Sequence, residues 1–274
     1  MCAGSNRDPS AGGWEMALLD LIGKSIDWPL YRIFGGKVQD AVLVDYWISR
    51  MGPDDTATAA RHAAAAGFHG IKMKCKWEDA NIVERVFAAH EAAPSLRIVM
   101  DPNECFYNLE NSLEMARPLE GLDVVFEDPF PKTDLREYRR LREETSVLVA
   151  PHLQNPRQVI HAVEMEAVDA INVAPSDWGF LDIARIAEAA DIPVWQASNV
   201  DLGLFDVFRL HVSAAVGNCT FGSDLCGNFV HEHSLLREPL VNNGYATVPE
   251  GPGLGVDLDE EAVTRYQVSH QQWS

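Results

Sequence analysis

The chain has 274 residues, of which 47% are hydrophobic, so it can bury a full core and suits one large α/β barrel or two ordinary domains. Its 22 basic and 41 acidic residues leave a formal net charge of −19, which repels phosphate backbones and anionic lipid surfaces. We therefore expect neither a nucleic-acid partner nor a membrane partner. No stretch approaches about 18 uncharged apolar residues, and residues 1–10 lack a signal-peptide pattern, which predicts a cytoplasmic protein.

The order of elements along the chain alternates between strand and helix. An Ala/Leu-rich helix is expected over residues 14–26, and a segment at 29–36 ends in a Gly-Gly turn. Eight short β-type runs follow, at residues 41–47, 70–75, 97–101, 124–127, 146–150, 170–173, 193–196 and 219–222. The segments between them have apolar faces and predict helices over residues 78–93, 108–119, 134–144, 156–165, 181–190 and 203–215.

The ends of the expected strands recur at a nearly constant spacing. The steps are 27, 26, 25, 22, 22 and 28 residues, counted along Lys74, Asp101, Glu127, His152, Ala174, Gln196 and Asp224. Each step is the length of a strand, a short loop, a helix and a return loop. Eight such units predict an α/β fold of the TIM type, a closed (β/α)8 or (β/α)7β barrel whose site lies at the carboxyl ends of the strands.

The end of the chain differs from the barrel in composition. Residues 248–256 are rich in Pro and Gly, and residues 257–266 form a charged, helix-like piece. We expect three parts: an N-terminal segment outside the fold (1–13), the barrel domain (14–240) and a C-terminal segment (241–274).

Two lysines stand out at the end of the second expected strand. Lys72 and Lys74 are two residues apart, so their side chains point to the same side of a strand and share a small volume. Two neighbouring ammonium groups disfavour each other's charge, which predicts that the pKa of one of them is lowered toward that of a working base. A Lys-x-Lys run alone is more typical of a solvated edge strand, so the interpretation depends on its partners.

Those partners stand at the ends of the next two strands. Asp101 and Glu127 can converge on one hard divalent cation, since magnesium prefers oxygen ligands and leaves positions open for substrate oxygen. A bound carboxylate substrate would then face the lysine pair. The cation would stabilise the negative charge that develops when Lys74 removes the proton next to that carboxylate.

With the Lys-Met-Lys run at 72–74, the Asp-Pro-Asn run at 101–103 and the Glu-Asp-Pro run at 127–129, the sequence resembles the enolase superfamily, in its mandelate racemase and muconate lactonizing branch. The resemblance extends to residues 17–24, 34–36 and 251–256. It implies an enolase C-terminal domain-like barrel that abstracts the proton alpha to a carboxylate through a metal-stabilised enediolate.

The resemblance also implies a role for each residue of the motifs. Lys74 corresponds to the base and Lys72 to the neighbour that lowers its pKa. Asp101 and Glu127 correspond to metal ligands, and Asn103 to a group beside the metal and the substrate. The implied cofactor is Mg²⁺, and the implied substrate is a small-molecule carboxylate.

One departure from the family pattern concerns the metal. The third ligand of the family is usually an acid at the end of the fifth strand, where this chain has His152. A neutral imidazole suits manganese, iron or zinc better than magnesium. His152 is therefore either a ligand that shifts the preference toward Mn²⁺ or another divalent metal, or a group that contacts the substrate; both interpretations stay open.

A second departure concerns the opposite face of the barrel. Ala174, Ala197 and Ser198 stand where relatives carry a second acid or base, which disfavours a two-base racemase. The run 224–226 replaces the DxD of dipeptide-epimerising relatives and argues against that substrate class. We expect one-base chemistry: a dehydratase or lyase acting on a hydroxy acid or acid sugar, with His152 or Asp224 as the acid. A racemase or cycloisomerase of the same family is the alternative.

A third departure is the N-terminal capping domain that the family uses to close the barrel mouth. The chain starts just before the barrel helix, which suggests a truncated reading of a longer gene, although residues 240–256, which pack on the cap in relatives, are present. A truncated, non-catalytic barrel homologue is therefore a further alternative. A metal hydrolase of another barrel class is disfavoured because no His-x-His follows the first strand. Assembly into a homo-oligomer is left open.

Overall fold

The computed structural model describes residues 9–198, 200–225 and 230–268. Residues 1–8 of the expected N-terminal segment, residues 269–274 and Cys226 lie outside the described residues. None of the helices in these ranges is long and apolar enough to cross a membrane.

The chain begins with two helices that pack against its own C-terminal segment. Helix α1 (Pro9–Ser25) is followed by the short α2 (Leu30–Ile33). Asp20 Oδ1 accepts a hydrogen bond from Leu254 N at 2.8 Å, and Gly253 N donates to Trp28 O at 2.9 Å. A Cβ on Gly23 would lie 2.8 Å from Gly253 Cα, so only glycine permits this approach. The division of the chain at residue 240 stays a prediction.

The barrel consists of two parallel sheets in one ring. The first has the order β2 (Tyr46–Ile48), β3 (Gly70–Lys74), β4 (Arg97–Asp101), β5 (Val124–Glu127) and β6 (Leu148–Ala150). The second has the order β7 (His152–Leu153), β8 (Ile171–Val173) and β9 (Val194–Gln196). Pro151 separates the two because it has no N–H for the ladder, yet its carbonyl accepts from Asn172 N at 3.1 Å. The predicted TIM-like barrel is therefore confirmed.

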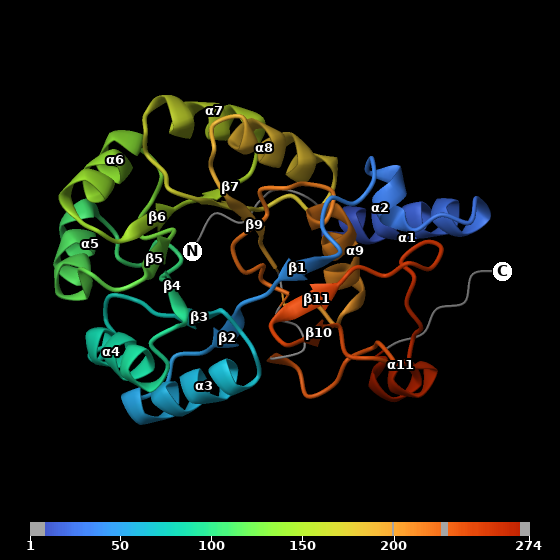
Figure 1. Cartoon of the computed structure of the whole chain (residues 1–274), viewed down its shortest axis with the longest axis horizontal. Helices are drawn as coiled ribbons and strands as arrows, with labels where there is room; N and C mark the ends of the chain where they lie inside the picture. The colour runs from blue at the N-terminus through green and yellow to red at the C-terminus, as the bar shows by residue number, and fades with distance from the viewer. Residues whose placement is uncertain (1–8, 199, 226–229, 269–274) are drawn as a thin grey trace.

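Helices lie outside this ring of strands (Figure 1). They are α3 (Pro53–Ala65), α4 (Ile82–Ala92), α5 (Leu109–Ala116) with the 3₁₀ turn η1 (Arg117–Leu119), α6 (Leu135–Glu144), α7 (Pro156–Glu164), α8 (Trp178–Glu188) and α9 (Leu204–Ser213). The six helices predicted between the strands correspond to α4–α9, with ends shifted by up to four residues at the N-terminus of α4, and the helix predicted over residues 14–26 corresponds to α1. Helix α3 was missed because its buried face consists of Thr56, Ala60 and Ala63, which give a weak periodic signal.

Two of the expected strands were wrong in detail. The run 41–47 is divided: β1 (Ala41–Leu43) pairs antiparallel with β11 (Tyr245–Thr247), which also pairs with β10 (Val241–Asn242), and only β2 joins the barrel. The run 219–222 forms no regular strand. It meets its neighbours through single bridges, Val194 with Cys219 and Val44 with Ser223, which close the ring. Beyond it, α11 (Glu260–Tyr266) is capped by Asp259.

An apolar layer fills the lower part of the barrel interior. It consists of Val99, Val125, Ala150, Ala170, Trp195 and Phe221. The rings of Trp195 and Phe221 stack at 5.5 Å, and the Arg97 guanidinium lies 4.2 Å from the Phe221 centroid. Because side chains two residues apart on a strand share a face, this layer places Asp101 above Val99 and Glu127 above Val125. The apolar layer therefore forms the floor of the site.

A carboxyl group is buried beside this floor. Asp45 is 4% exposed and lies in a slot left by two glycines, since a Cβ on Gly70 or Gly222 would come within 2.4 or 1.9 Å of its Oδ1 atom. Burial, followed by the charge of Asp224, raises the pKa of Asp45 to about 7. A carboxyl whose pKa is higher in the folded than in the unfolded state destabilises the fold as the pH rises between these two values.

We expect Asp45→Asn to stabilise the protein progressively more from pH 4 to pH 8. The pKa shift from 3.8 to about 7 corresponds to a gain of at most about 4 kcal/mol across this range. The measurement is urea unfolding of both proteins at several pH values. Asp55→Asn, an equal charge change at an exposed position of α3, is the control and should show no such trend. A difference between Asp45→Asn and the unsubstituted protein that does not depend on pH would contradict the assignment.

Candidate active site

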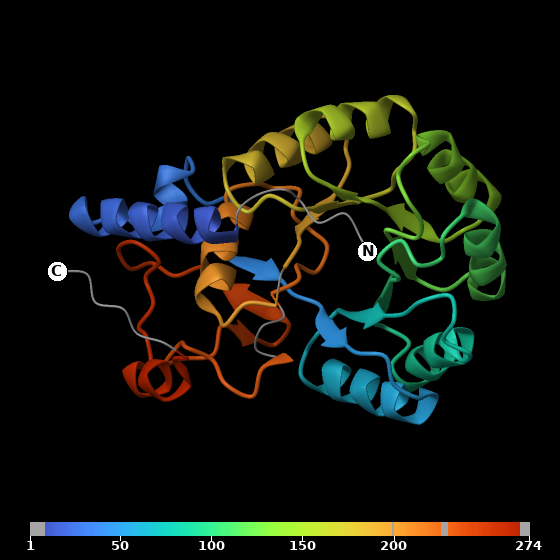
Figure 2. The same cartoon turned by 180° about the vertical axis from the view of Figure 1, so that it is seen from behind.

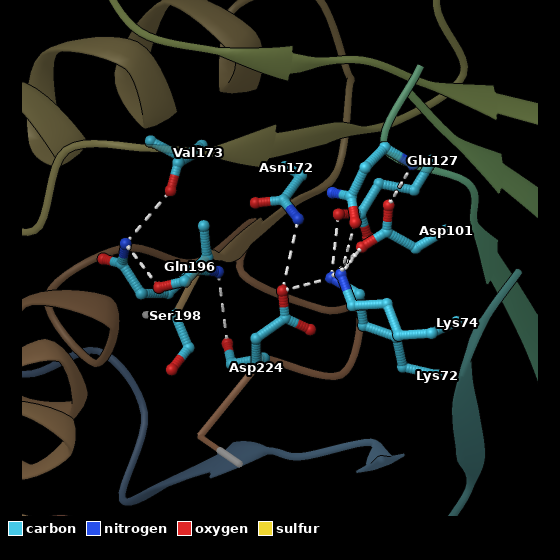
Figure 3. A network of polar contacts seen from close by, with 12 residues as sticks. Lys72, Lys74, Asp101, Glu127, Asn172, Val173, Gln196, Ser198 and Asp224 are labelled. Atoms are coloured by element: carbon cyan, nitrogen blue, oxygen red, sulfur yellow. Dashed lines mark hydrogen bonds and ion pairs between the residues drawn. The ribbon is translucent and has the colours of Figure 1, made fainter. Parts of the chain in front are cut away.

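The two lysines of β3 project into the mouth of the barrel, toward acids from three other segments (Figure 3). The side chain of Lys72 is 7% exposed and that of Lys74 is 30% exposed. The register of β3 against β4 pairs Lys74 with Asp101. The prediction that the two side chains share one side of a strand is confirmed, and the solvated-edge interpretation does not apply, because β3 lies between β2 and β4.

The ammonium group of Lys72 is surrounded by three carboxylates. Its Nζ atom lies 2.6 Å from Asp224 Oδ2, 2.8 Å from Glu127 Oε1 and 3.3 Å from Asp101 Oδ2. Each carboxylate comes from a different part of the ring: the run after residue 219, β5 and β4. One buried cation therefore ties together three segments that are far apart in the sequence.

Lys74 makes its contacts nearer to solvent. Its Nζ atom forms a close ion pair with Asp101 Oδ2 and donates to Asn103 Oδ1 at 3.1 Å. Asn103 has a φ of 49°, a left-handed conformation that asparagine tolerates, and its backbone N donates to Asp101 Oδ1 at 3.0 Å. The predicted base and the predicted substrate-side amide are thus brought together around Asp101.

The charges of this network do not cancel. Asp101, Glu127 and Asp224 oppose only Lys72 and Lys74, so one acid lacks a counter-charge. Burial opposes the charge of Asp101, but the two lysines outweigh it and hold its pKa below the ordinary value. Burial and the neighbouring Asp101 raise the pKa of Glu127 well above the ordinary value. Glu127 is therefore the acid of this network that takes up a proton most readily.

Of the two lysines, Lys72 is not the one whose pKa is lowered. Burial would lower its pKa, but Asp224, Glu127 and Asp101 outweigh burial and raise the pKa well above the ordinary value. Lys72 stays charged, as a cationic neighbour of Lys74 must. Sequence reasoning considered only the repulsion between the two lysines, whereas the carboxylates around Lys72 determine the direction.

His152 stands beside this network at the start of β7. Its backbone N donates to Asp128 Oδ1 at 2.7 Å, and its Nε2 atom is buried without a hydrogen-bond partner. Burial lowers the pKa of His152, so its imidazole is neutral at neutral pH. Asp128 also accepts from Lys132, whose Nζ atom lies 2.8 Å away and reaches Glu104 at 2.7 Å.

The predicted metal ligands have donors suited to a divalent cation. The buried atoms Glu127 Oε2 and His152 Nε2 have no hydrogen-bond partner, and three carboxyl groups of the network face two ammonium groups. In the part of the chain that the structure describes, however, no three His, Cys, Asp or Glu side chains converge closely enough to form a metal site. The donor chemistry fits a cation, and the roles of Asp101, Glu127 and His152 as ligands stay predictions.

Two buried residues that sequence reasoning missed hold Asp224 in place, Asn172 through its side-chain amide and Gln196 through its backbone carbonyl. Asn172 Nδ2 donates to Asp224 Oδ2 at 3.3 Å, and Gln196 O accepts from Asp224 N at 2.9 Å. The Gln196 side chain in turn donates to Val173 O at 3.0 Å and Pro175 O at 2.9 Å (Figure 3). The signal for Asn172 was a polar residue two positions after Ala170, an inward-facing alanine in the expected strand 170–173.

The opposite side of the mouth carries small side chains. Ala174 follows β8, and Ala197 follows β9. The hydroxyl of Ser198 accepts hydrogen bonds from Val200 N at 3.1 Å and Arg209 Nη1 at 3.4 Å. No side chain at these three positions can serve as a second base.

Comparison with known proteins places the chain among enzymes of related chemistry. The profile of the family described as enolase C-terminal domain-like matches residues 55–262. The chain is 29% identical to an N-succinylamino acid racemase of Thermus thermophilus, covering 92% of the chain and 69% of that relative. It is 27% identical to an arabinonate dehydratase of Saccharolobus solfataricus, covering 93% of the chain and 71% of that relative.

Solved structures show the same fold. The crystal structure of a muconate cycloisomerase from Pseudomonas fluorescens superposes with a TM-score of 0.84 at 22% identity, covering 94% of the chain and 74% of that structure. The relatives named here are thus a racemase, a dehydratase and a cycloisomerase. The chain spans about 70% of the length of the racemase and of the dehydratase.

We expect Lys72→Met to reduce the free energy of unfolding by about 3–5 kcal/mol, because it leaves three buried carboxylates short of their shared cation. Lys74→Met, the same change two residues along the strand, should cost clearly less, since Lys74 is 30% exposed and Asp101 keeps Lys72. Urea unfolding at pH 7 measures both. Equal losses would show that Lys72 does not hold the network together.

Proposed function

Because the chain belongs to the enolase C-terminal domain-like family, we propose that it removes the proton alpha to the carboxylate of a small hydroxy acid or acid sugar and eliminates water. The observation that carries the proposal is the placement of Lys74. It is the more exposed lysine of the network, it donates to the side-chain oxygens of Asp101 and Asn103, and it shares Asp101 with the buried ammonium of Lys72. A carboxylate substrate at the mouth would meet both lysines.

The elimination requires one base and one acid. The amine of Lys74 takes the alpha proton, the electron pair of the C–H bond forms the new double bond, and the C–O bond of the leaving hydroxyl breaks. The hydroxyl leaves as water as it takes a proton from Asp224 in its carboxylic acid form; His152 can be the acid only as an imidazolium that holds no cation. A single base also accounts for the alanines at the ends of β8 and β9, since inversion by a second base would need a basic group there.

Asp101, Glu127 and His152 would hold a divalent cation in this proposal. When bound, such a cation supplies positive charge that favours the ionised form of the substrate next to its carboxylate. The buried atoms Glu127 Oε2 and His152 Nε2, which have no hydrogen-bond partner, support this assignment. With an imidazole among the donors, the site should prefer a softer ion than Mg²⁺.

We expect the purified protein, supplied with Mn²⁺ or Mg²⁺ in D₂O, to exchange the alpha proton of at least one member of a hydroxy-acid and sugar-acid library. Lys74→Ala should lower this rate by about 10²–10⁴-fold. Lys76→Ala, which removes the third and 41% exposed lysine of the same run, should not. The rates are read by NMR, and loss of water by mass spectrometry.

Each result bears on a different part of this proposal. If no library member exchanges its alpha proton, the reaction class is wrong and the non-catalytic alternative gains support. If exchange persists in Lys74→Ala, the assignment of the base is wrong. Inversion without loss of water would favour a racemase over a dehydratase.

We expect His152→Glu to lower the preference of the protein for Mn²⁺ over Mg²⁺ by at least about tenfold, because it exchanges an imidazole for a carboxylate donor. Titration calorimetry with each metal alone measures this ratio without any substrate. His152→Gln removes the imidazole without adding charge and serves as the control. An unchanged ratio in His152→Glu would place His152 outside the metal's ligands.

A further inference from the structure

An arginine of α4, Arg85, is buried beside the strand that carries the lysine pair. Figures 1 and 2 show α4 next to α3, on the outer side of β2 and β3. Arg85 is 1% exposed, and in the described part of the chain it forms no ion pair with a carboxylate. Burial lowers its pKa, yet a guanidinium still stays charged at neutral pH. A full positive charge is therefore buried here without a counter-ion in contact.

The guanidinium of Arg85 donates to backbone carbonyls at the ends of two strands. Its Nη1 atom lies 3.1 Å from Lys74 O, and its Nη2 atom lies 2.9 Å from Ser49 O. A longer contact, at 3.4 Å, joins its Nε atom to Thr56 Oγ1 in α3. Because the donors of a guanidinium form a rigid planar fork, one side chain holds the two carbonyls at a set separation.

These two carbonyls stand where the ladder between β2 and β3 ends. The last pair of that ladder is Ile48 with Met73, and Ser49 and Lys74 are the next residue on each strand. A buried carbonyl beyond the last pair needs a donor from elsewhere. Arg85 supplies two donors, so it extends the connection of β2 with β3 by one residue, up to Lys74.

The peptide group that follows Lys74 is held on both of its sides. Its carbonyl accepts from Arg85, and its N–H, which belongs to Cys75, donates to Asp101 O at 3.3 Å. The backbone at Lys74 is therefore fixed against β2 and β4 at once. The Lys74 ammonium also pairs with the Asp101 side chain, so the backbone and the amine of this residue share one point of reference.

A packing role alone does not explain an arginine at this position. Burying an unpaired cation is costly, and an apolar side chain of similar volume would fill the same space at a lower cost. What only a guanidinium supplies is the pair of donors aimed at the two strand ends.

We propose that Arg85 is a positioning residue for Lys74: it fixes the end of β3 so that the amine stands where a base is needed. The inference rests on the proposed function for the role of Lys74 as the base. Arg85 itself is too deeply buried to touch a substrate. Its effect must therefore reach the reaction through the backbone of Lys74.

We expect Arg85→Met to lower kcat for exchange of the alpha proton by about 10–100-fold, because a misplaced base loses its alignment with the C–H bond. KM and the dissociation constant of Mn²⁺ should change by less than about twofold, since Arg85 contacts none of Asp101, Glu127 and His152 through its side chain. Thr56→Val is the matched control. It removes the contact with α3 but leaves both carbonyl bonds, so it should lower the stability and leave kcat unchanged.

A first readout needs no substrate. Lys74–Cys75 is the only Lys-Cys sequence in the chain, so protein with ¹³C-carbonyl lysine and ¹⁵N-cysteine gives one NMR correlation, which reports the Lys74 carbonyl. In Arg85→Met this carbonyl resonance should move upfield, because the oxygen loses a charge-assisted donor. It should stay in place in Thr56→Val. The only Lys-Val sequence, Lys37–Val38, gives the reference resonance in a ¹⁵N-valine sample.

A second readout without substrate is competitive acetylation of lysines by trace acetic anhydride, measured by mass spectrometry of peptides. The rate at Lys74 is divided by the rate at Lys24, which is 57% exposed and lies in α1. We expect this ratio to rise at least about threefold in Arg85→Met, since a looser strand end lets the amine leave Asp101. If Arg85→Met does not fold, Arg85→Lys should show the same changes to a smaller extent, because one ammonium cannot bridge two carbonyls as a fork does.

The outcomes separate this inference from the proposed function. An unchanged Lys74 carbonyl resonance or an unchanged acetylation ratio in a folded Arg85 variant overturns the inference, whether or not the protein turns over a substrate. Equal losses of kcat in Arg85→Met and Thr56→Val also overturn it, since they would assign Arg85 to helix packing alone. If the unsubstituted protein exchanges no alpha proton, the proposed function is wrong, and the two readouts without substrate still decide whether Arg85 positions Lys74.

Discussion

The buried ammonium of Lys72 is the contact on which the barrel mouth depends. The run after residue 219 joins the ring by single bridges rather than by a regular ladder, so few backbone hydrogen bonds hold it. The ion pair of Lys72 with Asp224 fastens this run to β3, and the pairs with Asp101 and Glu127 fasten β4 and β5 to the same point. Burying one cation is costly unless it is fully paired, and here each carboxylate that pairs it comes from a separate segment.

The layering of the interior explains why this network can exist. Below the mouth the barrel is filled with Val99, Val125, Trp195 and Phe221, which exclude water and leave the polar groups no other partners. Because the period of a strand is two residues, each inward apolar side chain is followed by an inward position nearer the mouth. Asp101 and Glu127 occupy those positions. The same periodicity makes the site a consequence of register, since a slip of one residue would turn the acids outward.

The sequence predicted this arrangement where its signals are local. The strands that carry Lys74, Asp101 and Glu127 are short apolar runs ending in polar residues, and the structure has them where they were expected. The split of the run 41–47 could not be read in this way, since β1 leaves the barrel to pair with β11, about 200 residues later in the chain. Helix α3 was hidden because alanines form most of its buried face. The raised pKa of Lys72 and the bond from Asn172 to Asp224 depend on which side chains meet across the ring, and the ring forms only in the fold.

The charges at the mouth give a physical reason for a cation there. Lys72, Lys74 and Lys132 face Asp101, Glu127, Asp224, Asp128 and Glu104, so the paired groups carry two more negative than positive charges when all are ionised. Burial raises the pKa of both Glu127 and Asp128, which makes these acids the ones to hold protons. An anionic substrate would add to the excess and would be repelled. Two positive charges supplied together would balance the groups and admit a carboxylate. The divalent ion of the proposed function would supply both charges and release the protons that Glu127 and Asp128 otherwise hold.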